Sequence, residues 1–183
     1  MLSLSQAFAI AGGPEFGSGR VRVTGTYAGV FVPIPTILDP GPPPVTLTDN
    51  SLALFTLKIA REGLAKGTVA IFRNGKAYTG DLQASADPDS GAVSGVISAI
   101  HTQTVTLPGG DGTSTVTFVF NNLANGVLKA KVAASNSTSS SSSVRLRGKQ
   151  SSISYTTGST DPSGDSGGPI FYKIHGFKQS ETS

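Results

Sequence analysis

The stretch that decides the fold is Ser51-Leu-Ala-Leu-Phe-Thr-Leu-Lys-Ile-Ala60. Side chains at its even positions would lie on one face of an extended chain, and those at its odd positions on the other. Residues 115–120, Thr-Val-Thr-Phe-Val-Phe, show the same alternation. A period of two is typical of strands that bury one face, so the chain is predicted to be all-β.

Turn signals separate these stretches. Asn74-Gly75 stands between two alternating runs and predicts a two-residue hairpin turn of type I′. The proline-rich segment 32–44 is predicted to be an extended loop, because proline cannot donate to the ladder of a central strand. Strands about 8–16 residues apart with turns between them predict an antiparallel meander of about nine strands. The meander is closed as a barrel or folded as a sandwich.

The domain organisation follows from the extent of the alternation. We expect one β-domain over residues 19–178, a flexible N-terminal segment over 1–18 and a flexible tail over 179–183. The expected strands are residues 19–32, 51–60, 67–73, 76–84, 92–107, 113–120, 126–134, 144–149, 151–157 and 169–177. Two of these, 113–120 and 126–134, are expected to form a hairpin across Asn121–Asn125.

The composition excludes several classes of protein. Hydrophobic residues make up 37% of the 183 residues, and 23 glycines and 11 prolines favour a fold with many turns. The absence of cysteine excludes disulfides, thiolate metal sites and a cysteine nucleophile. The net charge of +3 is mildly basic, but no dense basic cluster with interleaved aromatics predicts specific nucleic-acid binding.

The first residues resemble the end of a signal peptide. Ala7-Phe8-Ala9 and Ala9-Ile10-Ala11 both fit the small-x-small cleavage pattern, although no basic segment precedes them. We therefore interpret residues 1–18 as a flexible segment or the remnant of a signal peptide. This interpretation places the protein in the periplasm, the outer envelope or the medium of a bacterium. No apolar run reaches the roughly 18 residues of a membrane-spanning helix.

One motif points to catalysis. Gly164-Asp165-Ser166-Gly167-Gly168-Pro169 resembles the nucleophile loop of trypsin-like serine proteases, in which glycines shape the oxyanion hole beside the serine. The resemblance implies a triad of Ser166, His101 and Asp111. The chain departs from the family in its spacing, because Asp111 follows His101 by only 10 residues and His101 and Ser166 are only 65 residues apart. A degenerate or truncated serine hydrolase is therefore kept as an alternative.

Metal and cofactor sites are not predicted. His101 and His175 are the only histidines, and no thiolates accompany them. Asp87, Asp89 and Gly91 form a D-x-D-x-G fragment, and residues 161–165 form a second acidic loop. Neither loop has the later bidentate glutamate of an EF-hand, so both are interpreted as ordinary Asp-rich turns.

Basic side chains recur at every second position in three segments. They are Arg20, Arg22, Lys129, Lys131, Arg145, Arg147 and Lys149. Their apolar neighbours would point the other way, so adjacent strands would carry these residues as a positive stripe on one sheet surface. Such a stripe either binds an anionic polymer or lipid headgroups, or is a solvated face that discourages edge pairing.

The function predicted from the sequence is a non-enzymatic, exported or cell-envelope β-domain with a structural or binding role. The serine hydrolase and an anion-binding β-barrel are the two alternatives. A steep salt dependence of binding to an acidic polymer would favour the anion-binding barrel.

Overall fold

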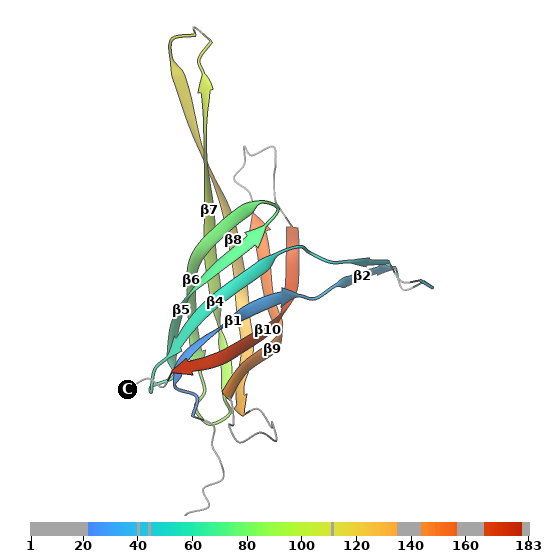
Figure 1. Cartoon of the computed structure of the whole chain (residues 1–183), viewed down its shortest axis with the longest axis vertical. Helices are drawn as coiled ribbons and strands as arrows, with labels where there is room; N and C mark the ends of the chain where they lie inside the picture. Colours follow the sequence, from blue (N-terminus) through green and yellow to red (C-terminus); the bar gives the residue numbers. More distant parts are fainter. Residues whose placement is uncertain are drawn as a thin grey trace, which may run out of the picture.

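The strands close into an antiparallel β-barrel in the computed structural model of the chain (Figure 1). The structure describes residues 22–39, 41–43, 45–110, 112–134, 144–156 and 167–180. All regular secondary structure in these residues is β. The predicted all-β class is confirmed, and the barrel is the one of the two predicted architectures that the chain adopts.

Eight strands form the barrel, and each pairs antiparallel with its two neighbours. In their order around the wall they are β1 (Gly25–Pro33), β10 (Gly167–Ser180), β9 (Val144–Thr156), β8 (Thr115–Ala134), β7 (Ala92–Pro108), β6 (Lys76–Ala86), β5 (Leu64–Arg73) and β4 (Leu52–Ile59). Two short strands, β2 (Thr36–Asp39) and β3 (Val45–Leu47), pair only with each other. β2 lies within the proline-rich segment 32–44, which was predicted to be an extended loop, and β3 follows that segment directly. Neither strand belongs to the barrel wall.

The first and last strands close the barrel. β1 pairs with β10 on one side, where Phe31 lies opposite Ile174, and with β4 on the other, where Phe31 lies opposite Ala53. A closed wall leaves no free sheet edge around its circumference. Closure therefore depends on pairing between residues at opposite ends of the chain.

The barrel interior is an apolar core filled by the inward half of each alternating pattern. Leu57, Ile71 and Ile153 are fully buried, and the rings of Phe31 and Phe55 meet edge-on at 5.1 Å. Burying a side chain of this size contributes about 1.5–3 kcal/mol each. In each strand, the alternation seen in the sequence therefore separates the side chains of the core from those of the surface.

One inward glycine in most strands allows neighbouring strands to approach closely. A Cβ on Gly67 of β5 would lie 1.8 Å from the carbonyl oxygen of Thr56 on β4. The same close approach occurs at Gly29, Gly80, Gly95, Gly126 and Gly148. Glycines at such positions permit the strong bending that a small barrel requires. The glycines that interrupt the sequence pattern therefore lie within the strands.

The predicted hairpin across Asn121–Asn125 is wrong. These residues lie in the middle of β8, a single strand of 20 residues that pairs without interruption with β7. Asn121 accepts a hydrogen bond from the Thr102 hydroxyl across the strand pair, at 3.1 Å. Asn122 points inward and is buried. Pairing with the long β7 overrode the local turn preference of asparagine.

The predicted break within 144–157 is also wrong, because β9 is continuous. The pairings Lys131↔Arg147 and Val127↔Ser152 differ by one residue, so β9 contains a β-bulge between them. The Ser151 hydroxyl accepts a hydrogen bond from the Lys129 backbone amide there, at 2.9 Å. This bulge explains why the alternation of the sequence is interrupted between residues 149 and 151.

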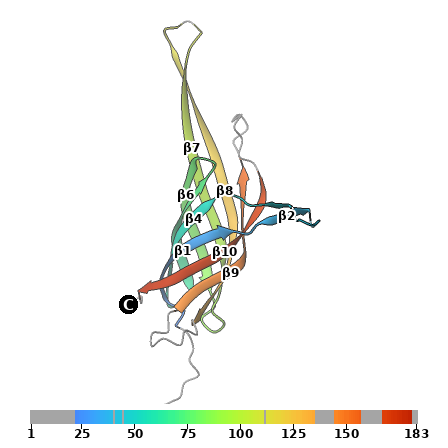
Figure 2. The ribbon, with the colours of Figure 1, turned by 45° about the vertical axis from the view of Figure 1, so that its right-hand side comes forward.

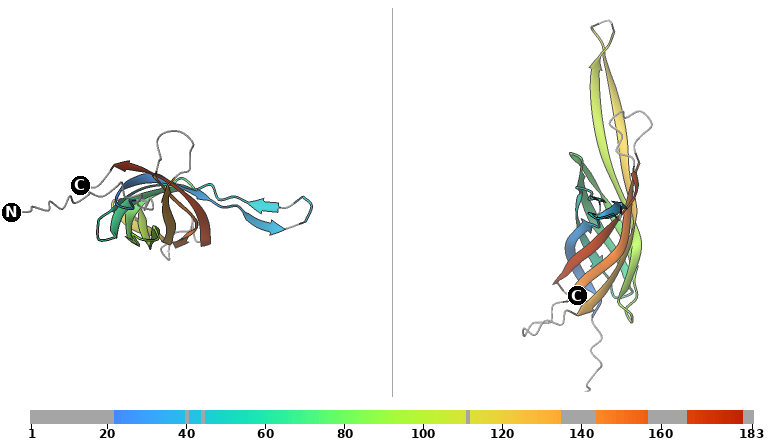
Figure 3. Two further views of the ribbon diagram at one scale, coloured as in Figure 1. Left: turned by 90° about the horizontal axis from the view of Figure 1, so that it is seen from below. Right: turned by 90° about the vertical axis from the view of Figure 1, so that its right-hand side faces the viewer.

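Two hairpins project from the barrel. β7 pairs with β6 only as far as Ile100, and β8 begins to pair with β9 only at Leu123. Beyond these points β7 and β8 pair only with each other and extend far past the barrel rim (Figures 1 and 2). We call residues 101–110 and 112–122 the arm. The β2–β3 hairpin leaves the barrel sideways (Figure 3).

Candidate functional site

Three adjacent strands bring the predicted basic residues together. Lys131 of β8 lies opposite Arg147 of β9, which in turn lies opposite His175 of β10. All three side chains are exposed, whereas Leu146 and Ile174 beside them are buried in the core. The row therefore runs across the outer wall of the barrel.

We call the cationic part of this wall the basic face. It consists of Lys129, Lys131, Arg145, Arg147, Lys149 and Lys173. β8, β9 and β10 contain no aspartate or glutamate, and neither do the flanking strands β7 and β1. Like charges directly opposite each other on a sheet are destabilising by up to about 1 kcal/mol. The Lys131–Arg147 pair therefore carries a cost that a bound anion would relieve.

The bulge in β9 places Lys149 near Lys173. Gly148 lies opposite Ile174 and Ser151 opposite Tyr172, so Lys149 and Gln150 both face the single residue Lys173 between them. Both lysines are exposed. The sequence prediction omitted Lys173. Alternation through Phe171, Lys173, His175 and Phe177 is the signal that would have included it.

Arg145 is held differently from the lysines. Its guanidinium lies 5.2 Å from the centre of the Phe177 ring, a cation–π contact with the residue opposite on β10. Its Nε is buried and has no hydrogen-bond partner among the described residues. A buried donor without a partner costs about 1–3 kcal/mol. Arg145 is therefore oriented by stacking, with a donor that the described side chains leave unsatisfied.

One predicted residue of the stripe lies elsewhere. Arg22 precedes β1 and is exposed, and its carbonyl oxygen accepts a hydrogen bond from Lys178 Nζ at 3.1 Å. The pairing of β1 with β10 ends at Thr26↔Ser180, so Arg22 lies beyond the end of β10 and off the basic face. Arg20 lies outside the described residues.

The two histidines lie on different faces of the barrel wall. His101 continues the inward side of β7 at the rim, where its Nδ1 is 2.9 Å from the Ala77 carbonyl oxygen and its ring lies beside Tyr78. His175 is on the outer face of β10. Ser166 and Asp111, the other members of the implied triad, lie outside the described residues.

The polar groups of the acidic turn after β6 form hydrogen bonds with one another. Asp87 accepts hydrogen bonds from the Ser90 hydroxyl and from the backbone amides of Asp89 and Ser90. These bonds, led by the Ser90 hydroxyl, lower the pKa of Asp87. No group of three metal-ligating side chains occurs in the described ranges, and the loop 161–165 lies outside them.

A polar cluster occupies the barrel end beneath the arm. Arg73 Nε donates to Asp49 Oδ2 at 2.8 Å, and the Arg73 guanidinium lies 4.2 Å from the centre of the Tyr155 ring. The Tyr172 hydroxyl is 2.7 Å from the Ser51 hydroxyl and 3.0 Å from that of Tyr155. Burial raises the pKa of both tyrosines, so their hydroxyls stay protonated and serve as hydrogen-bonding groups.

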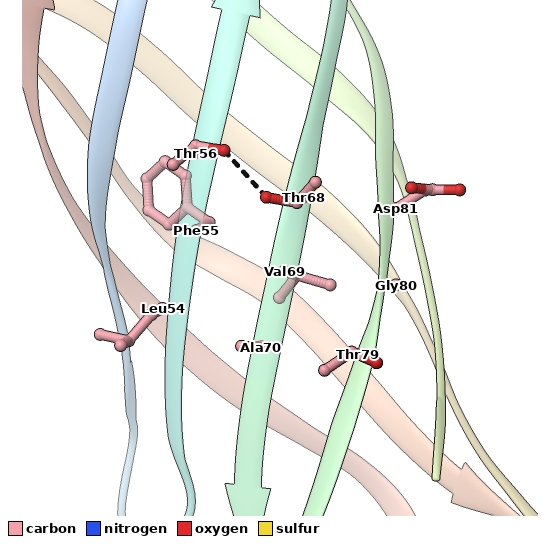
Figure 4. Close-up of a pocket in the computed structure, with 9 residues that line it drawn as sticks. All are labelled: Leu54, Phe55, Thr56, Thr68, Val69, Ala70, Thr79, Gly80 and Asp81. Carbon is pink, nitrogen blue, oxygen red and sulfur yellow. Dashed lines mark hydrogen bonds between the residues drawn. The ribbon is translucent and has the colours of Figure 1, made fainter. Parts of the chain in front are cut away.

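A groove of about 480 Å³ lies on the outer wall over β4, β5 and β6 (Figure 4). The hydroxyls of Thr56 and Thr68 are joined at 2.9 Å at one end of the groove, and Asp81 lies opposite Thr68 in the same row. Leu54 and Ala70 contribute apolar side chains to its lining, and Gly80 contributes backbone only. In the barrel order this groove lies across the molecule from the basic face.

Comparison with protein-family models, with curated proteins and with solved structures finds no match for this chain. The described part of the chain contains no helix of the length and hydropathy needed to cross a membrane.

Proposed function

We propose that this protein is a non-enzymatic, exported binding module whose basic face holds an anionic polymer. One observation carries the proposal. Six of the chain's 14 lysines and arginines make up the basic face, and the three adjacent strands that carry it, β8, β9 and β10, contain no carboxylate side chain. A surface with one sign of charge attracts a polyanion and releases its counterions.

The shape of the face favours a polymer over a single small anion. Adjacent strands are about 4.8 Å apart, and alternate residues on a strand are about 6.6 Å apart. The charges of Lys131, Arg147 and Lys149 are thus spread in two directions over the convex outer wall. Successive anionic groups of one chain could each meet a separate cation, as phosphates do on nucleic-acid-binding surfaces.

The location of the protein is part of the same proposal. The small-x-small patterns near Ala9 and the lack of cysteine are compatible with export. Anionic polymers such as acidic polysaccharides are accessible outside the cell. The proposal therefore names an acidic polysaccharide or a comparable polyanion as the ligand class.

Charge reversal on the basic face tests the proposal. The variant Lys131→Glu/Arg147→Glu should bind heparin, used as a sulfated-polymer probe, at least about tenfold more weakly than the native protein. It should also show a shallower dependence of affinity on salt, because fewer counterions are released. Titration calorimetry or fluorescence anisotropy at several salt concentrations measures both effects.

The barrel provides a matched control. Lys58 of β4 and Lys66 of β5 also lie directly opposite each other and are exposed, on the far side of the wall. Lys58→Glu/Lys66→Glu makes the same change in net charge and should retain near-native binding. Equal losses in the two double variants would show that net charge alone attracts the probe and would refute the proposed face. Binding to vesicles of anionic lipid but not to heparin would also refute it.

A further inference from the structure

The arm has two strand edges that no described strand covers. Over residues 101–108, β7 pairs only with β8, and over residues 115–122, β8 pairs only with β7. A two-stranded hairpin is marginally stable by itself, and exposed edges are templates for pairing with another chain. The arm is therefore a two-stranded sheet with two open edges that extends away from the barrel (Figure 1).

The hydrogen-bond pattern shows which residues present their backbone to each edge. Gly109 N donates to Ser114 O at 2.7 Å, so this directly opposed pair is a hydrogen-bonded one. Hydrogen-bonded and non-hydrogen-bonded pairs alternate along an antiparallel ladder. The pair Thr106↔Thr117 is therefore a non-hydrogen-bonded one, and the backbone amides and carbonyls of both residues point outward.

The two edges are not equivalent. Pro108 occupies an outward position on the β7 edge, opposite Thr115, and has no amide hydrogen to donate. The β8 edge contains no proline in Thr115–Asn122 and reads Thr-Val-Thr-Phe-Val-Phe before the two asparagines. Short β-prone segments without charge or proline are the ones that pair most readily. Only the β8 edge is thus open along its length.

The surfaces of the arm carry no charged side chain among the described residues 102–110 and 112–122. One face exposes Leu107, Val116 and Phe118 at 43–50% of their surface, and Phe118 stacks against Phe120. The other face carries threonines, with the hydroxyls of Thr106 and Thr117 3.2 Å apart. Charged side chains, which usually protect an exposed edge, are missing here.

We propose that the arm pairs with the arm of a second copy of this chain through the β8 edge, residues 115–122. Two identical edges related by a two-fold axis run antiparallel, so each outward donor meets an acceptor of the same segment. The product is a four-stranded sheet with one apolar face, which meets the minimum for independent stability.

A second copy fits this edge better than a charged partner does. The molecule carries a net charge of +3, and its cations are concentrated on the barrel wall, whereas the described arm is uncharged. Antiparallel pairing of the two projecting arms places the barrels at opposite ends of the shared sheet and keeps the two basic faces apart. The proposal does not depend on what the basic face binds.

Matched proline variants test the pairing in the full-length protein. Thr117→Pro removes an outward amide from the β8 edge, and Thr106→Pro removes one from the β7 edge at the same height. Neither removes a β7–β8 ladder bond, and each loses the same threonine–threonine contact. We expect the native protein and T106P to dimerise in sedimentation velocity, and T117P to dimerise at least about tenfold more weakly.

The absence of cysteine allows a second test that does not require proline. Single variants Thr117→Cys and Thr106→Cys are treated with a short bis-maleimide at low protein concentration. T117C is expected to give a cross-linked dimer and T106C to remain monomeric. Equal cross-linking of both variants, cross-linking of T106C alone, or a native protein that stays monomeric at its highest soluble concentration would overturn the proposal.

Discussion

Asp49 illustrates how one side chain links local geometry to stability. It lies just before β4, accepts a hydrogen bond from the Ser51 backbone amide and forms the ion pair with Arg73 at the end of β5. Burial alone would raise the pKa of Asp49. The hydrogen bonds from Ser51 and Arg73 and the charge of Arg73 together hold the pKa below its ordinary value.

This lowered pKa predicts an acid-dependent loss of stability. The unfolded state binds a proton at Asp49 more readily than the folded state does, so the contribution of Asp49 is complete above about pH 4 and is lost as the pH falls below that. Asp49→Asn should be less stable than the native protein at pH 7, by about 1–3 kcal/mol. The difference should shrink below pH 4, as measured by urea unfolding across pH.

Asp81→Asn is the control for removing a carboxylate that forms no ion pair. Asp81 is exposed on the outer wall of β6 and makes no ion pair among the described residues. D81N should follow the native profile. A D49N protein whose stability deficit stayed constant from pH 7 to pH 3 would contradict the role given to this ion pair.

Strands are shaped by their inward glycines. The Cβ of an alanine at position 67 would overlap the Thr56 carbonyl of the neighbouring strand, so β4 and β5 would have to separate. Gly67→Ala should therefore lower the free energy of unfolding by about 1–3 kcal/mol, the range typical of overpacked sites. Denaturant unfolding followed by circular dichroism measures the change.

Gly110, at the tip of the arm, is the matched control for this strand effect. A Cβ there would have no atom within 4 Å, and its backbone is not in the left-handed region. Gly110→Ala should change stability by no more than about 0.5 kcal/mol. Similar losses at positions 67 and 110 would show that close approach of the neighbouring strand is not the cause of the effect.

The boundaries of the strands show where local patterns fail. The Asn74-Gly75 hairpin is correct, because both residues have positive φ in a two-residue turn between β5 and β6. Asn121 and Asn125, which resemble turn residues, lie within β8 instead. A single strand side by side with β7 satisfies more backbone hydrogen bonds than a turn would, and this gain is invisible in a short window.

In the whole molecule, the barrel is closed by the first and last strands of the chain. β10 lies between β1 and β9, so the last strand completes a wall that begins with the first. A chain that ends at residue 166 would leave both neighbours with an open edge and expose core residues such as Tyr27 and Leu146. We expect this truncated chain to lose cooperative unfolding and to bind the dye ANS, which detects exposed apolar surface.

The intact chain should fold slowly for the same reason, on the millisecond-to-second scale of proteins with non-local pairing. Stopped-flow refolding measures the rate. Retention of a cooperative transition at the native denaturant midpoint in the truncated chain would contradict closure by β10.

The all-β class, the inward and outward sides of most strands, and the turns at Asn74-Gly75 and after β6 follow from the sequence alone. Each of these depends on residues close in the chain, where side-chain period and turn chemistry act directly. The sequence also identified Lys129, Lys131, Arg145, Arg147 and Lys149 as members of alternating runs.

Three features required the folded chain: the sheet closes as a barrel, β8 and β9 are continuous, and the runs of basic residues on β8 and β9 lie on adjacent strands. The tertiary structure added Lys173 to the basic face and placed Arg22 beyond it. These features depend on which strands pair and in which register. Pairing is set by contacts between distant segments, and the period of two within each strand is the same whichever neighbour it meets.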